Sequence, residues 1–409
     1  MLSPMTPLRR RTLLLTIASL AAVVLALSMA LVTLSLASGG SEDEAIRPDA
    51  EAVLTPLGME IENPPNPVLG ADDKYHLAYE ITIVNQTPSQ VTIDQVQPRA
   101  GGEPFGAPLE GAELESLLRV NGGGGPAIPG GGSALLFMDV TYDPGVATPK
   151  LLTHGFNLAL SDPPQADQEF NFIGVPTRVG QRRAIEVAPP LRGPGWVAAN
   201  GCCSPINAHR GATLSIDGTV RVPERFAIDF VQLNADDRLF EGPIDLLSSY
   251  AYFGEEIHSA TAGKVVGLQD GLPEQTPGAL PTGETIQTAG GNHLVIRIDK
   301  GHYAFYAHMQ PGSLRVGLGD RVRKGQVLGL LGNSGNTDGP HLHFHIMDGP
   351  SPLQSNGLPF VYSKFTGQGR VTDEAALVSG EVTPIDRDSL AGEFRDRMPL
   401  GLQVVDFGD

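Results

Sequence analysis

Cysteine is almost absent from this chain of 409 residues, which contains only Cys202 and Cys203, side by side. Without a third cysteine there is no conventional disulfide framework. In an oxidising compartment these two neighbouring cysteines could form only a strained disulfide with each other. We expect a mainly structural role, and thiolate ligation of a metal is the alternative.

Basic residues are also scarce, because 28 Lys and Arg stand against 46 Asp and Glu, giving a formal net charge of −18. Removing residues 1–37, which hold three Arg and no acid, leaves −21. Such acidity argues against a nucleic acid partner. It also argues against simple electrostatic attraction to an anionic polymer, so a substrate of that kind would have to be held by contacts in a groove.

Charged residues make up only 18% of the chain, whereas Gly and Pro number 50 and 34. This composition favours short strands and turns over helices, and it predicts an all-β protein. The length is sufficient for two or three domains, each with a core of its own.

The first uncharged stretch, residues 12–37, follows Arg9, Arg10 and Arg11. At 1.5 Å per residue it is roughly 39 Å long as a helix, enough to cross a bilayer core. The basic flank predicts that the rest of the chain faces outward. Residues 1–40 are therefore expected to be a membrane anchor or, since Ser35-Leu36-Ala37 offers a small-x-small site, a cleaved signal peptide. Either alternative predicts export.

Residues 41–70 are rich in Gly, Pro and acid and are expected to form an extended linker. From 71 to 180 the pattern alternates as in strands, for example over 77–84 and 91–96, with Gly-rich turns between runs. We predict a β-sandwich here that resembles immunoglobulin-like modules. It has no clustered His or Cys, so packing, spacing and partner binding are all open as its role.

The most informative stretch is 335–345, which reads GNTDGPHLHFH. On a strand His341, His343 and His345 share one face, while the residues between them face the core. Neutral imidazoles at this spacing can bind zinc and move protons beside it. The alternative is a surface strand that is His-rich by chance.

Two segments upstream lead towards the same site. Residues 303–308 read as the second strand of a hairpin, and its alternation turns His308 in the same direction as Ala304 and Tyr306. Residues 268–290 form a Pro- and Gly-rich loop without periodicity. This loop is expected either to line a groove or to be a disordered insertion.

Together, YAHM (306–309), GDRVRKGQVLG (319–329), GNSGNT (332–337) and HLHF (341–344) resemble the lysostaphin-type, or LytM-like, zinc metallopeptidases. The resemblance covers about residues 252–347. It implies an antiparallel β-sheet domain related to the duplicated hybrid motif, which we place at 190–365. Residues 366–409 are expected to be an acidic C-terminal tail.

The same resemblance implies a zinc site. In the family a metal-binding strand reads His-x-Gly-x-Asp, and the corresponding residues here run from Arg225 to Asp229. Asp229 matches, but an arginine does not deprotonate and so does not ligate. His209 is the best substitute, the alternative being a surface histidine beside Arg210. The expected ligands are therefore His209, Asp229 and His343.

By resemblance, His341 is the general base and His308 stabilises the developing oxyanion. His345 stands where the family commonly has Glu and is either an orienting group or a neutral replacement. The expected function is that of an exported zinc metalloendopeptidase that hydrolyses peptide bonds in peptidoglycan peptides.

Two rival hypotheses belong to other classes. The first is a catalytically inactive LytM-like binding module that engages a partner in the cell envelope, which the arginine at position 225 motivates. The second is a structural envelope protein with the sandwich as its adhesive part. The structural protein predicts no bound metal.

Overall fold

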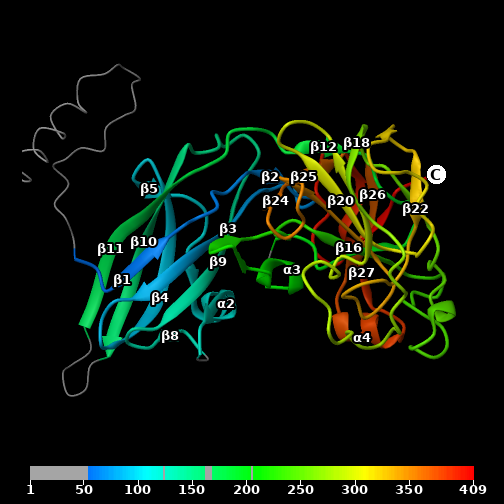
Figure 1. The fold of residues 1–409 in the computed structure, drawn as a ribbon. Helices are drawn as coiled ribbons and strands as arrows, with labels where there is room; N and C mark the ends of the chain where they lie inside the picture. Colours follow the sequence, from blue (N-terminus) through cyan, green and yellow to red (C-terminus); the bar gives the residue numbers. More distant parts are fainter. Residues whose placement is uncertain (1–53, 123–124, 162–167, 204–205) are drawn as a thin grey trace, which may run out of the picture. The chain divides into compact units, whose positions relative to one another are not determined.

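The computed structural model describes residues 54–409 except 123–124, 162–167 and 204–205, and Thr55–Asp409 forms one compact unit (Figure 1). The segment expected to cross the membrane, 12–37, lies outside the described residues. Among the residues that are described, none of the helices has the length and apolar character needed for a membrane span.

Two antiparallel sheets make up the N-terminal half of the described chain. The five strands of the first sheet are β1 (Leu57–Glu60), β2 (Val68–Leu69), β3 (Tyr75–Asn85), β7 (Leu118–Val120) and β9 (Ser133–Tyr142). The six strands of the second are β4 (Gln90–Ala100), β5 (Glu103–Pro104), β6 (Leu109–Glu110), β8 (Ala127–Ile128), β10 (Leu151–Ser161) and β11 (Gln168–Arg178). We call these two sheets the sandwich.

One hydrophobic core joins both sheets of the sandwich. Tyr79 and Ile81 of β3 belong to the same buried cluster as Phe156 and Leu158 of β10. Alternating apolar residues along each strand create these inward faces. The expected β-sandwich is thus present, while its immunoglobulin-like topology stays a prediction. Strands β1 and β2 lie within residues 41–70, which we expected to be an extended linker. That expectation is wrong for these residues, because Leu57 and Val68 are buried and both strands pair with β3.

An eleven-stranded sheet dominates the C-terminal half, and all of its pairs are antiparallel. In order from one edge, with β24 paired to β23, its strands are β21 (Arg321–Val322), β18 (Gly263–Gln269), β19 (Asn292–Arg297), β20 (Tyr303–Met309), β23 (Leu342–Met347), β24 (Gly357–Leu358), β16 (Ile228–Gln232), β13 (Trp196–Ala199), β28 (Gln403–Asp406), β26 (Phe365–Val371) and β27 (Ile385–Phe394). The all-β prediction is confirmed.

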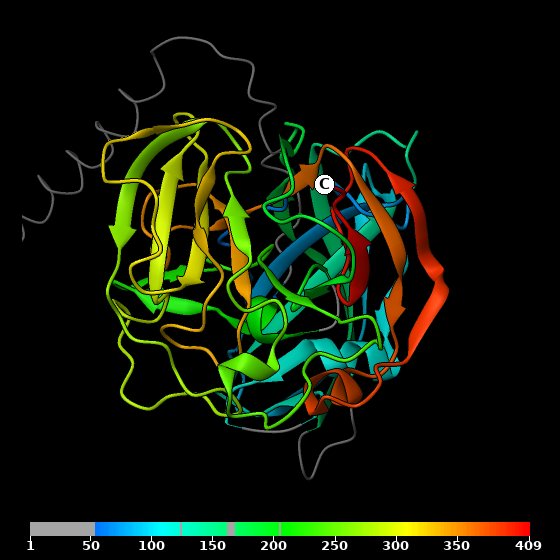
Figure 2. The same cartoon turned by 90° about the vertical axis from the view of Figure 1, so that its right-hand side faces the viewer.

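Residues 366–409, expected to be an acidic tail, instead extend this sheet. Figure 2 shows their orange and red strands as long arrows. Val404 and Val405 of β28 are buried and pair with β13. Strand β27 forms the edge of the sheet, is largely exposed and carries three of the nine acidic residues of this segment. Charge is common on edge strands because it discourages pairing with other chains, and here it conceals the strand pattern.

The remaining elements are short. Three strand pairs stand outside the large sheets, namely β12 (Ile185–Val187) with β25 (Phe360–Tyr362), β14 (Leu214–Ile216) with β15 (Thr219–Arg221), and β17 (Glu256–His258) with β22 (Val327–Leu330). The helical segments are α2 (Gly111–Leu117), α3 (Ala208–Gly211), α4 (Glu374–Ser379) and the 3-10 turn η1 (Leu247–Ser249).

Strand β23 lies between β20 and β16 near the middle of the large sheet. Leu342, Phe344 and Ile346 point into the main hydrophobic core. The alternation therefore turns the intervening His343 and His345 to the opposite face, as the sequence predicts.

Candidate metal centre

Sheet register brings the first two predicted ligands together. Asp229 of β16 is directly opposite His343 of β23. On the other side His343 pairs with Ala307 of β20, one residue before His308. Side chains directly opposite on neighbouring strands share a face. The backbone pairing alone therefore places a carboxylate and an imidazole side by side.

The carboxylate of Asp229 is the hub of the cluster. Its Oδ1 lies 2.9 Å from Nδ1 of His343 and 3.4 Å from Nε2 of His341. Its Oδ2 lies 3.2 Å from Nε2 of His209 and accepts a hydrogen bond of 2.8 Å from Nδ2 of Asn200. Two of the expected ligands, His209 and His343, thus both contact the third, Asp229.

His209 reaches the cluster from outside the sheet, on the short helix α3. Its Nδ1 lies 2.9 Å from the carbonyl oxygen of Asn200 and 3.0 Å from that of Ala227. Because carbonyl oxygens only accept, Nδ1 carries a proton, and Nε2 is the ring nitrogen that faces the Asp229 carboxylate. The side chain is buried, so the alternative of a surface histidine is wrong.

Arg225, at the position where the family has a ligand, is buried away from the cluster. Its Nε donates to the Glu80 carboxylate of β3 at 3.1 Å. Arginine thus replaces the usual ligand with an ion pair to the sandwich.

His308 and His341 are held in the same tautomeric form. Nδ1 of His308 donates to the carbonyl of Ser334 at 2.8 Å, and Nδ1 of His341 donates to that of Gly339 at 2.9 Å. Each ring therefore carries a proton on Nδ1, which leaves Nε2 for contacts within the cluster, and the ring centroids are 4.5 Å apart. His308 has a φ of 61°, a conformation that costs energy in a residue with a Cβ.

His345 contacts the ring nitrogen of His343 that does not face Asp229. Its Nδ1 lies 2.8 Å from Nε2 of His343, while its own Nε2 is buried without a partner. If Nδ1 of His343 is the ligand atom, Nε2 of that ring carries the proton and donates to His345. This geometry favours the orienting role over a neutral replacement.

The ionisable side chains at this site strongly change one another's pKa values. Burial alone would lower the pKa of His209, but the Asp229 carboxylate outweighs it and raises the pKa to about 9. Against its own burial, Asp229 has a pKa held well below its usual value by His209 and His341. Burial and the neighbouring imidazoles lower the pKa of His308 well below its usual value. The site therefore attracts positive charge to Asp229 and keeps His308 neutral.

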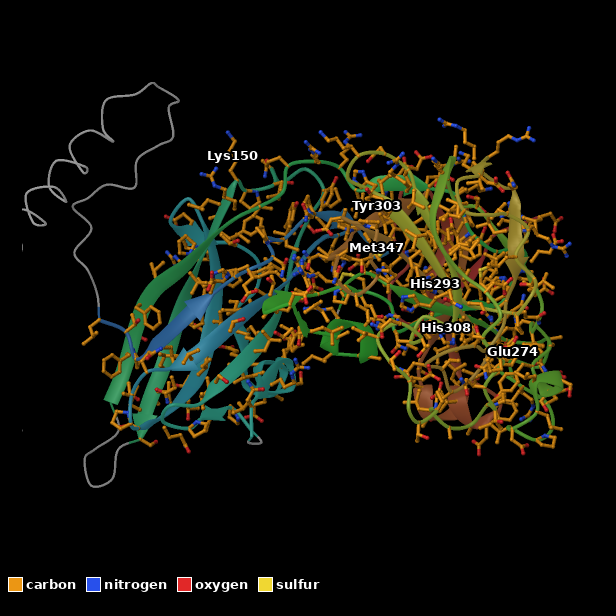
Figure 3. All side chains as sticks on the ribbon, viewed as in Figure 1. Lys150, Glu274, His293, Tyr303, His308 and Met347 are labelled. Carbon is orange, nitrogen blue, oxygen red and sulfur yellow. A yellow bond between two sulfur atoms is a disulfide. The ribbon has the colours of Figure 1, made fainter. Side chains whose placement is uncertain are left out.

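The cluster forms part of the wall of a cavity of about 590 Å³. His293 of β19 and Phe305 of β20 stand beside it, and Figure 3 shows His293 and His308 in the same part of the sheet. The loop expected at 268–290 contributes Leu280 and Ile286 to the wall. That loop is an ordered part of the structure, so the disordered insertion is excluded.

Two overlapping trios in this cluster have the geometry of a metal site. The ligand atoms of His209, Asp229 and His343 lie within 4.8 Å of one another, and so do those of His308, His341 and His343. Zinc binds nitrogen and oxygen at about 2.0–2.2 Å, which puts neighbouring ligand atoms of a tetrahedron about 3.4 Å apart. The contacts of Asp229 at 2.9 and 3.2 Å are close to that spacing. Two nitrogens, one oxygen and an open cavity fit a zinc centre.

A third trio consists of His76, Asp139 and Cys203. Cys203 forms a disulfide with Cys202, so it offers no thiolate to a metal. The pair therefore has the structural role that the sequence favours, and thiolate ligation is wrong.

Three neighbours of the cluster escape prediction from the sequence. Asn200 follows β13, which pairs with β16 at Asp229, so only the sheet register reveals it. Glu224 lines the cavity immediately before the buried Arg225. His293 belongs to a hairpin strand whose pairing decides which way it points.

The comparisons with known proteins agree with this geometry. Residues 247–355 match the family described as Peptidase family M23. The resemblance to lysostaphin-type peptidases is thereby confirmed for this region. The match includes His308, His341 and His343, whereas His209 and Asp229 precede it.

Curated relatives align over the same part of the chain. The glycyl-glycine endopeptidase ALE-1 of Staphylococcus capitis is 33% identical over 95 residues, which are 23% of this chain and 26% of that protein. The peptidoglycan DD-endopeptidase ShyA of Vibrio cholerae is 30% identical over 90 residues, which are 19% and 20%. The chain thus spans about a quarter or less of the length of these relatives.

One similar solved structure is a mutant catalytic domain of the prophage-encoded M23 protein EnpA from Enterococcus faecalis. It is 20% identical, covers 42% of this chain and 93% of that one, and has a TM-score of 0.25.

Proposed function

We propose that the protein is an exported zinc metalloendopeptidase that hydrolyses peptide bonds in peptidoglycan peptides. The observation that carries the proposal is the convergence of three imidazoles on the Asp229 carboxylate at the wall of an open cavity. Two relatives are named as endopeptidases, one of them for peptidoglycan. The names of these relatives indicate peptide bonds as the bonds cleaved, and the geometry of the site supports metal-assisted hydrolysis.

His209, Asp229 and His343 would hold the metal through Nε2, a carboxylate oxygen and Nδ1. Zinc, when bound, polarises a carbonyl and lowers the pKa of water to about 7. Asn200 donates to one carboxylate oxygen and the carbonyls beside His209 fix its ring. These contacts lock the ligand atoms before the metal arrives.

His341 is placed to accept the proton of the attacking water. Its Nε2 lies 3.4 Å from Oδ1 of Asp229 and would be free to accept a proton once a metal takes up the charge of that carboxylate, while the Gly339 carbonyl prevents the ring from turning. His308, 4.5 Å away between ring centroids, also keeps a free Nε2. The proton that His341 takes from the water would have to pass to that nitrogen before His308 could donate to the developing oxyanion or the leaving amine. General acid–base catalysis of this kind contributes roughly 10²–10⁴-fold to the rate.

The cavity favours an uncharged peptide backbone as its ligand. Leu280 and Ile286 supply apolar surface, and no Lys or Arg is among the described residues of the wall. Glu224 and Asp338 are its other acids besides Asp229. Peptides rich in small residues such as Gly and Ala would fit, whereas a carboxylate-rich segment would be repelled.

The test combines metal content with hydrolysis. The purified full chain should contain about one zinc per molecule and should release new amino groups from purified peptidoglycan. His341→Ala should keep the zinc and lose the hydrolysis. A further control is His302→Ala, because His302 contacts Asp299 at a hairpin turn outside the cavity.

The negative results of this test lead to different conclusions about the function. A wild-type chain that takes up no zinc after reconstitution would overturn the proposal. Zinc without hydrolysis of wall peptides, matched by tight binding to them, would instead support the inactive binding module.

A further inference from the structure

Three charged side chains lie buried together where the sandwich contacts the strands of the metal centre. Glu80 of β3, Arg210 of α3 and Arg225 are 7%, 3% and 3% exposed. Burying charges is costly unless they are paired and hydrogen-bonded. These charges lie close to the metal centre without forming part of it, and their burial needs a physical explanation.

Arg225 connects Glu80 to the strand that carries Asp229. Its Nε and Nη2 donate to Oε2 of Glu80 at 3.1 and 2.5 Å, and Nη2 also donates to the carbonyl of Asn63 at 3.3 Å. Two residues further along, the Ala227 carbonyl accepts the Nδ1 proton of His209. The ion pair thus fixes the backbone that orients the His209 ring.

Arg210 makes a second connection, because it directly follows His209. Its Nη2 donates to the Met138 carbonyl of β9 at 3.2 Å, and its Nε lies 3.7 Å from Oε1 of Glu80. Its guanidinium carbon lies 5.7 Å from the ring centroid of Phe137. Through these contacts the sandwich holds α3 in place.

A third connection is exposed. Nη1 of Arg119, on β7, donates to the Gly211 carbonyl at the end of α3 at 2.9 Å. Three strands of one sheet, β3, β7 and β9, therefore contribute to holding this helix, and β3, β9 and α3 are labelled in Figure 1.

Helix α3 needs such support more than the strands do. Asp229 and His343 lie on paired strands inside a large sheet. The helix of His209 has only four residues, and a helix this short is unstable without tertiary contacts. The ligand with the weakest support from its own element is the one next to the buried charges.

We infer that the sandwich is a structural component of the metal centre, in which Glu80 is a positioning residue for His209 and Arg119 is a second, weaker support. This inference rests on the proposed function, since it concerns the same zinc ligands. It assigns to the sandwich a role in metal affinity, in addition to spacing or partner binding.

The experiment compares zinc affinity in the full chain by competition with a chelator. Glu80→Gln removes the charge that both arginines face. Glu60→Gln is the matched control, because Glu60 is an exposed residue of β1 in the same sheet. Removing a group that orients a metal ligand typically weakens binding by roughly 10–100-fold. We expect that loss in Glu80→Gln and an unchanged affinity in Glu60→Gln.

A spectroscopic readout separates positioning from a general loss of stability. Cobalt replaces zinc in such sites, and its visible absorption reports the number and geometry of the ligands. Cobalt-loaded Glu80→Gln should show the same spectral change as His209→Ala, whereas Glu60→Gln should match the wild type. If Glu80→Gln does not fold, Arg119→Gln decides, because its side chain is exposed; we expect a several-fold loss of zinc affinity there.

The outcomes separate the two proposals. A folded Glu80→Gln chain with wild-type zinc affinity and an unchanged cobalt spectrum overturns the positioning role and leaves the peptidase proposal intact. If Glu80→Gln fails to fold, wild-type affinity in Arg119→Gln overturns it instead. A wild-type chain that binds no zinc overturns both.

Discussion

The sandwich and the metal centre each bury histidine against aspartate, but in opposite proportions. In the sandwich a single imidazole, His76, meets two carboxylates, with Nδ1 2.9 Å from Asp139 and Nε2 3.2 Å from Asp72. In the metal centre a single carboxylate, Asp229, meets three imidazoles.

The number of carboxylates relative to imidazoles decides which ring nitrogens stay unprotonated. Burial lowers the pKa of His76, but Asp139 and Asp72 outweigh it and raise the pKa to about 10, so both ring nitrogens are donors. Around Asp229 the carboxylate outweighs burial and raises the pKa of His209 to about 9 and also that of His341, whereas the pKa of neighbouring His308 falls well below its usual value. Two carboxylates around one imidazole therefore make a closed ion pair in the sandwich, whereas one carboxylate among several imidazoles leaves His308 neutral, as a metal centre with a free imidazole would need.

The largest effect is expected from removing the central carboxylate. Asp229→Asn should reduce the zinc content from about one per chain to almost none, because the site loses its only negative ligand. Asp139→Asn makes the same change in the sandwich and should leave the zinc content unaltered. Elemental analysis of both variants would contradict the comparison if Asp139→Asn lost as much zinc as Asp229→Asn.

The next effect concerns turnover without loss of metal. His341→Gln and His308→Gln should each lower kcat by roughly 10²–10⁴-fold, because each removes an Nε2 that faces the cavity. Zinc content should stay at the wild-type level in both. Loss of the metal from both variants would instead favour the trio His308, His341 and His343 as the ligand set.

A smaller effect should appear in stability alone. His76→Gln leaves two carboxylates without their cation, and breaking a buried ion pair costs on the order of 3 kcal/mol in the free energy of unfolding. Urea denaturation should show this loss, while the purified variant still contains zinc. An unchanged midpoint would mean that the His76 ion pair contributes nothing to the sandwich.

The smallest effect is a dependence on pH. The pKa of His76 is raised from about 6.5 unfolded to about 10 folded. Its stabilising contribution is therefore complete below about pH 6.5 and is lost as the pH rises through 10. The stability difference between wild type and His76→Gln should shrink between pH 7 and pH 10. A difference that stays constant over this interval would show that His76 is neutral in the folded protein.

Local patterns predicted much of the site. Strand alternation is a property of neighbouring residues, so it put His343 and Asp229 on one face of the sheet, as the register of their strands has them. The sandwich strands were predictable for the same reason. The strand pattern of residues 366–409 was hidden by the charges of the edge strand β27.

Contacts between distant segments were not predictable in this way. Glu80 and Arg225 are 145 positions apart, and nothing in either local sequence indicates their ion pair. The choice of His209 rested on elimination and resemblance, because its position on α3 depends on carbonyls at Asn200 and Ala227. Sequence therefore identified the groups that face the cavity, and the structure identified what holds them.

The central claim is that the metal belongs to His209, Asp229 and His343. The most direct measurement is a crystal structure of the zinc-loaded protein with anomalous data collected at the zinc edge. Our account predicts one peak bounded by Nε2 of His209, a carboxylate oxygen of Asp229 and Nδ1 of His343, with His341 and His308 beside it and unligated. A peak bounded by His308, His341 and His343 and remote from His209 would contradict it.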